Sequence, residues 1–286
     1  HENYVGYINP EQHFNHKNIL CNQIIEYQSL GPILILDGSA SYTKTKYEKL
    51  GYSLIHTPDY TKYARLKIIV RNIKTTSGTR KNPKRTTQKL IAQDIKNILF
   101  ELDGLSVFPL MTKKEIAIYQ ALDVITEDQL QYFQLDFESN SLPMNLLNTR
   151  GKNHLAEETV LYLTSLPIKP PDYYKQLALS LNNRVAELSL ILNKSEEDGL
   201  NWFKDPFIQK IYSEEILSEL VQIIHRTNVR RLNEDSDKPV YIYIASHLCD
   251  FLAELFETYE NIILISDDAL RDKLSLELKA KKNEQK

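Results

Sequence analysis

The stretch VYIYIA, Val240–Ala245, carries the pattern that decides the fold. Its side chains are all apolar or aromatic, with no alternation of polar residues, which is typical of a β-strand buried on both faces. Short runs of the same kind recur along the chain, at Ile33–Leu36, Leu66–Val70, Leu105–Leu110, Thr159–Leu166 and Ile262–Ser266. The sequence therefore predicts several strands of a buried sheet.

Amphipathic helical patterns lie between these runs. Apolar residues three and four positions apart predict helices over Thr87–Leu102, Lys113–Leu122, Asp172–Leu192, Glu214–Arg226 and His247–Tyr259, and one more in the stretch FNHKNILCNQIIEYQSL that ends before Gly31. Strands that alternate with such helices favour an α/β fold, a mostly parallel sheet covered by helices on both faces. Ligands of such sheets bind where the strands end, so the residues that follow the strands are the first candidates for a site.

The composition is that of an ordinary globular protein. The chain has 286 residues, of which 42% are hydrophobic and 26% charged, enough for one large domain or two smaller ones. No apolar run reaches the roughly 18–20 residues that span a bilayer, and the first residues lack a signal-peptide pattern. We therefore expect a cytoplasmic location and no membrane partner. The first residue, His1, is not Met, which suggests a piece of a longer protein.

A basic block stands out within an acidic chain. Residues Tyr60 to Gln93 contain ten Lys or Arg and no Asp or Glu, whereas the rest of the chain carries 25 basic and 38 acidic residues. This imbalance predicts a local anionic partner, with a solvated loop as the alternative. An acid-free loop of this kind can follow the phosphates of single-stranded or duplex nucleic acid without reading bases. The candidate contacts are Arg71, Lys74, Lys81, Lys84 and Arg85.

A second group of cations lies in ELVQIIHRTNVRRL, Glu219–Leu232. Gln222, Arg226 and Arg230 share this stretch with His225 and Arg231, and no acid separates them. Arginine stays charged and its planar fork binds phosphate through two nitrogen atoms. We therefore expect these side chains to face phosphates. The alternative is a surface helix whose arginines bind acids of the same protein.

Four segments, in this order along the chain, resemble motifs of superfamily 2 helicases. ILILDGSA is similar to the strand and turn that end the first RecA-like lobe and couple ATP state to nucleic-acid binding. LSVFPLMTKKE resembles the strand and helix that open the strand-binding part of the second lobe. TRGKNHLAEETVLYLTSLPIKPPDYY is similar to the Gly-x-Asn segment, and QIIHRTNVR to the motif that supplies the arginine finger. The resemblance covers roughly Gly31 to Ser246 and implies a RecA-like fold, a P-loop NTPase fold without its P-loop.

The resemblance also implies roles for particular residues. Arg226 would be the arginine finger, with Gln222 one turn earlier at a phosphate or the attacking water. Thr149, Gly151 and Asn153 would contact the nucleic-acid backbone, and the basic loop is expected to border the same cleft. Asp37 and Ser39 would couple the lobes.

Two departures from the family pattern affect these roles. The turn reads Asp37-Gly38-Ser39-Ala40 rather than Ser/Thr-Ala-Thr. The second arginine of the last motif commonly follows the first by three residues, where this chain has Val229. Both Arg230 and Arg231 therefore remain candidates for that position.

The nucleotide-binding motifs of the family are missing. A P-loop reads G-x-x-x-x-G-K-[ST], and the only Gly-Lys pair here, Gly151-Lys152, is followed by Asn153. No Asp-Glu pair follows a strand to hold magnesium. In the family both motifs belong to the N-terminal lobe. The resemblance thus implies that residues 1–48 end the first lobe with a helix, a strand and the DGSA turn. Residues 49–286 would be the second lobe and a helical tail.

The expected function is that of the C-terminal lobe of an ATP-dependent nucleic-acid helicase or translocase. ATP and Mg²⁺ would be bound mainly by the absent N-terminal RecA-like lobe, so the isolated chain is expected to be inactive. The alternative is a non-catalytic nucleic-acid-binding or assembly module that kept the fold. A nuclease that uses Asp37, Asp267 and Asp268 is a third possibility. No metal site is predicted, because no histidine has another ligand at a suitable spacing.

Overall fold

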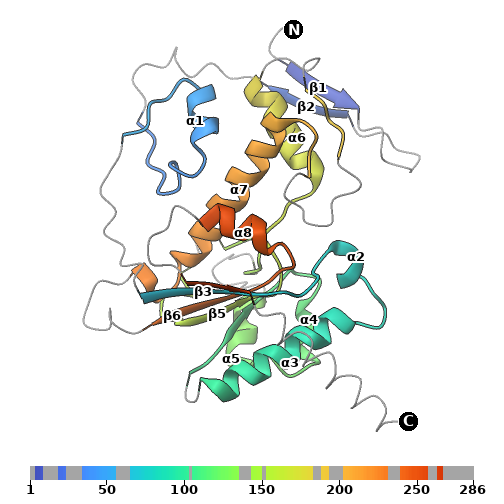
Figure 1. The fold of residues 1–286 in the computed structure, drawn as a ribbon, viewed down its shortest axis with the longest axis vertical. Coiled ribbons are helices and arrows are strands. Elements are labelled where there is room, and N and C mark those ends of the chain that lie inside the picture. Colours follow the sequence, from blue (N-terminus) through green and yellow to red (C-terminus); the bar gives the residue numbers. More distant parts are fainter. Residues whose placement is uncertain are drawn as a thin grey trace. The chain divides into compact units, whose positions relative to one another are not determined.

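A computed structural model gives the fold of the chain (Figure 1). It describes residues 4–8, 19–23, 34–55, 65–102, 105–134, 143–149, 153–182, 188–192, 202–230, 239–256 and 263–266. The chain divides into two compact units: unit 1 comprises His1–Pro58 and Ile168–Glu219, and unit 2 comprises Asp59–Pro167 and Leu220–Lys286. The residues from 168 to 219, expected in the second lobe, thus belong to the same unit as the N-terminal segment.

Unit 2 contains a five-stranded sheet in which every neighbouring pair of strands is parallel. The strands are β3 (Leu66–Arg71), β4 (Phe108–Leu110), β5 (Val160–Leu163), β6 (Val240–Ala245) and β7 (Ile263–Ser266), in the order β4-β5-β6-β3-β7. Each strand falls within or overlaps a predicted apolar run. The predicted α/β class with a parallel sheet is therefore confirmed, and the arrangement is consistent with a RecA-like fold.

Helices cover both faces of this sheet. Figure 1 shows α3 (Thr86–Glu101), α4 (Ile116–Gln120) and α5 (Glu127–Leu130) on one face and α8 (Cys249–Phe256) on the other. The short helices α2 (Ser77–Arg80), η3 (Gln131–Phe133) and η5 (Asn228–Arg230) complete unit 2. In α3 the buried residues Ile91, Ile95 and Ile98 recur three and four positions apart, so one side of the helix is apolar.

Unit 1 contains an antiparallel pair of strands and three helices among its described residues. The strands are β1 (Tyr4–Ile8) and β2 (Ile19–Gln23), and the helices are α1 (Lys44–Lys49), α6 (Pro171–Asn182) and α7 (Pro206–Ile224), whose last five residues belong to unit 2. Tyr174, Phe203 and Tyr212 are buried and pack edge to face with one another. These aromatic side chains form a small core between α6 and α7.

Two local predictions are wrong. The predicted helix before Gly31 contains β2, which pairs with β1 from Ile8↔Ile19 to Tyr4↔Gln23. The predicted buried strand over Ile33–Leu36 does not form where it is described: Leu34 and Leu36 are 74% and 89% exposed, and the segment has no strand conformation. Backbone pairing with β1 overrides the helical spacing in the first case. In the second, no strand in the described part of the chain pairs with the apolar run.

Candidate functional site

The arginine turn, residues 225–230 after the end of α7, lies at the amino edge of the sheet, where the strands of unit 2 begin. After α7 ends, Asn228 donates its backbone N–H to the carbonyl of Glu158, two residues before β5, at 3.0 Å. Arg65, directly before β3, donates from Nη1 to Asn228 Oδ1 at 3.0 Å and from Nη2 to the Asn228 carbonyl. The turn is therefore fixed by residues that precede two different strands.

Glu158 extends this polar cluster at the amino edge. Burial raises the pKa of Glu158, and a hydrogen bond with Ser106 opposes that effect only in part. Ser106 precedes β4, so residues before β3, β4 and β5 all contribute to the cluster. No local pattern in the sequence points to these contacts, and the sequence analysis missed Arg65, Glu158 and Asn228.

Arg230 and Asn153 meet at the same edge. Arg230 is exposed, and its Nη2 donates to Oδ1 of Asn153 at 3.2 Å, across 77 positions of sequence. Asn153 begins a turn in which its carbonyl accepts the N–H of Ala156 at 3.0 Å, and the next side chain, His154, packs its ring 4.7 Å from that of Tyr132. The structure thus brings together two residues that the sequence assigned to different ligands.

The other predicted residues of this region are less exposed. Gln222 lies in the last turns of α7, whereas Arg226 lies beyond the end of that helix, which stops at Ile224. The predicted continuation of the helix to Arg226 is therefore wrong. Both side chains are half-buried and engaged in contacts, and Thr149 is buried. Gly151 and Arg231 lie outside the described residues.

Arg71, the first residue of the predicted basic surface, is buried. Its Nε lies 3.3 Å from Oδ2 of Asp94 on α3, and its guanidinium lies 5.0 Å from the ring centre of Tyr243. Tyr162 donates its hydroxyl to the same carboxylate oxygen at 2.7 Å. Burial and the nearby Asp94 raise the pKa of Tyr162 well above its ordinary value. Arg71 therefore belongs to a polar network between the sheet and α3, and not to the exposed surface.

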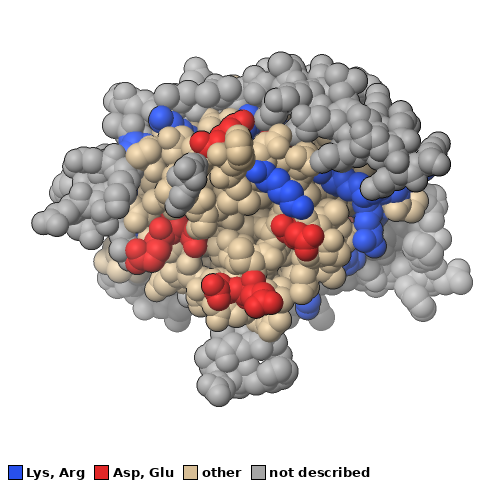
Figure 2. All heavy atoms as spheres, turned by 90° about the horizontal axis from the view of Figure 1, so that it is seen from below, with Lys and Arg blue, Asp and Glu red and all other residues tan. Residues whose placement is uncertain are grey.

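The other four predicted phosphate contacts lie on the surface, as expected for a solvent-exposed loop. Lys74, Lys81, Lys84 and Arg85 are all exposed between the end of β3 and the start of α3. Arg85 has a φ of 51°, a left-handed conformation in which the chain turns into α3. Figure 2 looks onto the side of the sheet that α3 covers in Figure 1. Its largest group of Lys and Arg side chains lies toward the right, the side where Figure 1 has α2.

The base of this loop is held by three contacts. Gln88 on α3 donates its amide to the carbonyl of Arg80 at 2.6 Å. The Nη1 atom of Arg80 lies 3.3 Å from Oε2 of Glu115, and the hydroxyl of Thr112 donates to the same oxygen. Arg80 is thus engaged with a carboxylate from the residue that precedes α4. The cations beyond it project from a fixed base.

The basic loop and Asn153 lie at opposite edges of the sheet. The loop follows β3, whereas Asn153 contacts Arg230 near the residues that precede β3 and β5. A strand of six residues, the length of β3, separates its ends by roughly 17–20 Å. The expectation that the loop borders the same cleft as Asn153 is therefore wrong.

The predicted coupling residues, Asp37 and Ser39, form a closed turn in unit 1. Oδ1 of Asp37 accepts the N–H and the hydroxyl of Ser39 at 2.8 and 2.7 Å, and Oδ2 accepts the hydroxyl of Tyr47. Burial alone would raise the pKa of Asp37, but these hydrogen bonds and the charge of Lys46 outweigh it and lower the pKa. Asp37 is therefore an acceptor that holds this turn together.

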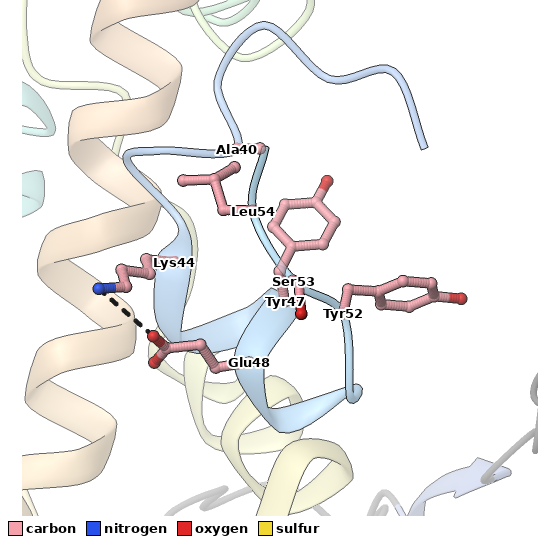
Figure 3. A pocket seen from close by; sticks show the side chains of 7 residues that line it. All are labelled: Ala40, Lys44, Tyr47, Glu48, Tyr52, Ser53 and Leu54. Carbon is pink, nitrogen blue, oxygen red and sulfur yellow. Dashed lines mark ion pairs between the residues drawn. The ribbon is translucent and has the colours of Figure 1, made fainter. Parts of the chain in front are cut away.

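A pocket of about 400 Å³ lies beside this turn (Figure 3). Figure 3 shows Lys44 and Glu48 paired on one side of α1, with the rings of Tyr47 and Tyr52 on the other. The full lining is Ala40, Lys44, Tyr47, Glu48, Tyr52, Ser53 and Leu54. The helix is held to α7 by Glu214, which accepts the N–H and hydroxyl of Thr45 at 3.2 and 2.5 Å.

Neither a metal centre nor a membrane span is found in the ranges that the structure describes. Within them no three His, Cys, Asp or Glu side chains gather to hold a metal ion, and no helix is long and apolar enough to cross a membrane. Asp267 and Asp268, of the nuclease alternative, lie outside these ranges. Comparisons with protein-family models, with curated proteins and with solved structures found no match to this chain.

Proposed function

We propose that the chain is the C-terminal lobe of an ATP-dependent nucleic-acid helicase or translocase. The observation that carries the proposal is the fixed arginine turn at the amino edge of a parallel α/β sheet. Arg65 and Glu158 hold the turn at Asn228, and the guanidinium of Arg230 is exposed two residues later. A cation that is already in place stabilises developing charge without reorganisation at the moment of reaction.

In this proposal the arginine turn faces the phosphates of ATP. ATP and Mg²⁺ are held mainly by an N-terminal RecA-like lobe, and Arg226 acts as the arginine finger. Such a finger contributes ~10³–10⁵-fold to the rate of phosphoryl transfer. Gln222, one turn earlier on α7, contacts a phosphate or the attacking water.

The basic loop supplies the second half of the function, binding of a nucleic-acid strand. Lys74, Lys81, Lys84 and Arg85 are exposed, no acid lies among them in the sequence, and their base is fixed by Arg80 and Glu115. Four phosphate contacts predict that log affinity for a single strand falls against log salt concentration with a slope of roughly −3. Bases are not read, so all sequences bind alike.

The exposed run at Leu34–Leu36 supports a partner lobe. Its continuous apolar pattern is typical of a strand buried on both faces, yet two of its leucines are more than two-thirds exposed. We propose that this run completes the parallel sheet of the N-terminal lobe. The ordered Asp37–Ser39 turn that follows would then report the state of that lobe to unit 1.

The loop is tested by replacing Lys81, Lys84 and Arg85 together with serine. Fluorescence anisotropy of labelled single strands at several salt concentrations should show weaker binding of every sequence and a flatter slope. A control with the same charge change replaces Lys44, Lys204 and Lys210, which are exposed in unit 1. An unchanged affinity and slope in the loop variant would show that the loop does not bind the nucleic-acid strand.

The alternative function, a non-catalytic binding or assembly module, shares the loop but not the role of the arginines. It is favoured by the same exposed cations, because their binding to phosphates needs no nucleotide. The two functions differ in what Arg226 does in a protein that includes the N-terminal lobe.

A further inference from the structure

Arg230 and Asn153 lie within hydrogen-bond distance of each other, so a single ligand can account for both residues. The resemblance assigned Arg230 to the phosphates of ATP and Asn153 to a nucleic-acid backbone. In the 3.2 Å contact, Oδ1 of Asn153 accepts from Nη2 of Arg230, so the amide oxygen is already engaged with the guanidinium. We propose that the pair is one phosphate-binding unit, in which Arg230 contacts the phosphate and Asn153 positions its guanidinium. The inference rests on the proposed function and changes the role of Asn153 within it.

The partner of Arg230 differs from those of the arginines that pair with a carboxylate. Arg71 and Arg80 each pair with a carboxylate, of Asp94 and Glu115, so an anionic ligand would have to compete with a fixed negative charge. Among the described residues, the hydrogen-bond acceptor of Arg230 is a neutral amide. A neutral acceptor fixes the guanidinium without cancelling its charge. Arg65 also has a neutral acceptor, but it is buried, whereas Arg230 is exposed and can meet a ligand.

The guanidinium also has donors left over for a ligand. Arginine carries five N–H donors in a planar fork, and the contact with Asn153 uses one of them. Arg230 is exposed, and among the described residues its guanidinium donates to Asn153, so the remaining donors can bind two oxygens of one phosphate. Ordering this long side chain costs entropy when a ligand binds. A side chain that Asn153 already holds has lost part of that freedom beforehand, which favours binding.

Asn153 is itself held firmly enough to position another side chain. Its carbonyl accepts the N–H of Ala156, and the following turn leads to Glu158, whose carbonyl accepts the N–H of Asn228. Asn228 is two residues before Arg230, so the backbone of both partners is tied to the same short segment before β5. The distance between Asn153 and Arg230 is therefore set by main-chain contacts, and not by the two side chains alone.

The phosphate has two possible sources, a nucleotide or a nucleic-acid strand. Inorganic tripolyphosphate, measured by isothermal titration calorimetry, represents the nucleotide. A labelled single-stranded oligonucleotide, measured by anisotropy, represents the strand. If Arg230→Ala lowers the affinity for tripolyphosphate, the phosphate comes from a nucleotide. If it lowers the affinity for the oligonucleotide, the phosphate comes from a nucleic-acid strand. The basic loop does not obscure the result, because its contribution is the same in all variants that are compared.

A double-mutant cycle with Asn153→Ala, Arg230→Ala and the double variant tests the positioning role. We expect Arg230→Ala to weaken one probe about tenfold or more, and Asn153→Ala to weaken the same probe about threefold to tenfold. In the Arg230→Ala background, Asn153→Ala should change the affinity by less than about twofold, because its effect passes through the arginine. Arg230→Lys should recover little, since lysine lacks the planar fork.

Two results would overturn the inference, and they have different meanings. If the effects of the two single substitutions multiply in the double variant, Asn153 contacts the phosphate on its own, and the proposed role of Arg230 stands. If Arg230→Ala changes neither probe, the pair binds no phosphate, and this part of the proposed function fails as well. Asn97→Ala, which removes an amide from α3, is the control for general effects. Equal thermal unfolding temperatures show that each variant is folded.

Discussion

The guanidinium of Arg71 lies 3.3 Å from the carboxylate of Asp94 in the interior of unit 2. Asp94 is fully buried, and Arg71 is 8% exposed at the end of β3. The first of the cations that were predicted to contact nucleic acid is therefore part of the core. The basic block thus contains cations with contacts inside the fold, Arg65, Arg71 and Arg80, and exposed cations that can meet a ligand.

Replacing Arg71 with serine should lower the free energy of unfolding by about 3–5 kcal/mol. The substitution leaves the buried Asp94 carboxylate without its counter-ion, and breaking a buried pair costs that much. Lys74→Ser removes an exposed cation three residues later and should change the free energy by less than about 0.5 kcal/mol. Urea unfolding followed by circular dichroism compares the two. Equal effects would contradict the structural role of Arg71.

Arg65→Met should destabilise unit 2 by about 1.5–3 kcal/mol, because the side-chain oxygen and the carbonyl of Asn228 lose a charged donor. Lys67→Met, which removes a half-buried cation from β3, is the matched control. The same Arg65 variant should also lose the affinity for phosphate that depends on Arg230. A variant that unfolds more easily yet keeps this affinity would show that Arg65 does not fix the arginine turn.

Arg226→Ala should reduce kcat for ATP by ~10³-fold or more in a protein that includes the N-terminal lobe. The affinity for ATP should remain, because the finger acts mainly in the transition state. The 286-residue chain alone should release no phosphate from ATP, since it has neither P-loop nor magnesium carboxylates. Turnover by the chain alone, abolished by a substitution within it, would refute the proposed division of labour. An unchanged kcat would favour the binding module.

The contact of Glu214 with α1 predicts a dependence of stability on pH. Burial raises the pKa of Glu214 above its ordinary 4.5, and Glu48 adds to this, while hydrogen bonds from Thr45 and the charge of Lys210 oppose it in part. The folded state therefore binds this proton more tightly than the unfolded chain does. The stabilisation is complete below the ordinary pKa and is lost as the pH rises through the raised pKa.

Glu214→Gln removes this dependence, because glutamine is neutral throughout. From pH 4.5 toward neutral pH, the stability of the wild type should therefore fall relative to that of the variant. Trp202, the only tryptophan of the chain, lies in unit 1 and reports its unfolding by fluorescence in urea. Glu127→Gln, at an exposed position on α5, controls for the loss of a negative charge. A constant difference between wild type and variant would contradict the prediction.

The strands of unit 2 could be predicted because their signal is local. Runs such as Val240–Ala245 and Leu66–Val70 are apolar on both faces, and the structure has β6 and β3 there. The exposed run at Leu34–Leu36 has the same pattern and failed, because burial needs neighbouring strands that a local pattern cannot show. β2 failed for the converse reason, since its pairing with β1 outweighs the helical spacing of its apolar residues.

The types of residue in the candidate site could be predicted from the sequence, but which residues contact one another could not. Arg71 reads as part of a basic loop, yet it is the last residue of β3 and its side chain meets α3. The contact of Arg65 with Asn228 joins residues 163 positions apart and leaves no local trace. Exposed positions in the loop were easier to predict, because a stretch rich in Lys, Arg and Thr seldom packs into a core.

The exposed leucines at positions 34 and 36 should affect how the purified chain behaves in solution. Exposed apolar side chains on a segment that pairs with no strand of the described residues invite strand exchange between molecules, and such segments are common starting points of aggregation. The purified chain should accordingly show a yield and a particle size that worsen with concentration. Serine at both positions should relieve this without lowering the melting temperature, since neither leucine is packed against the fold.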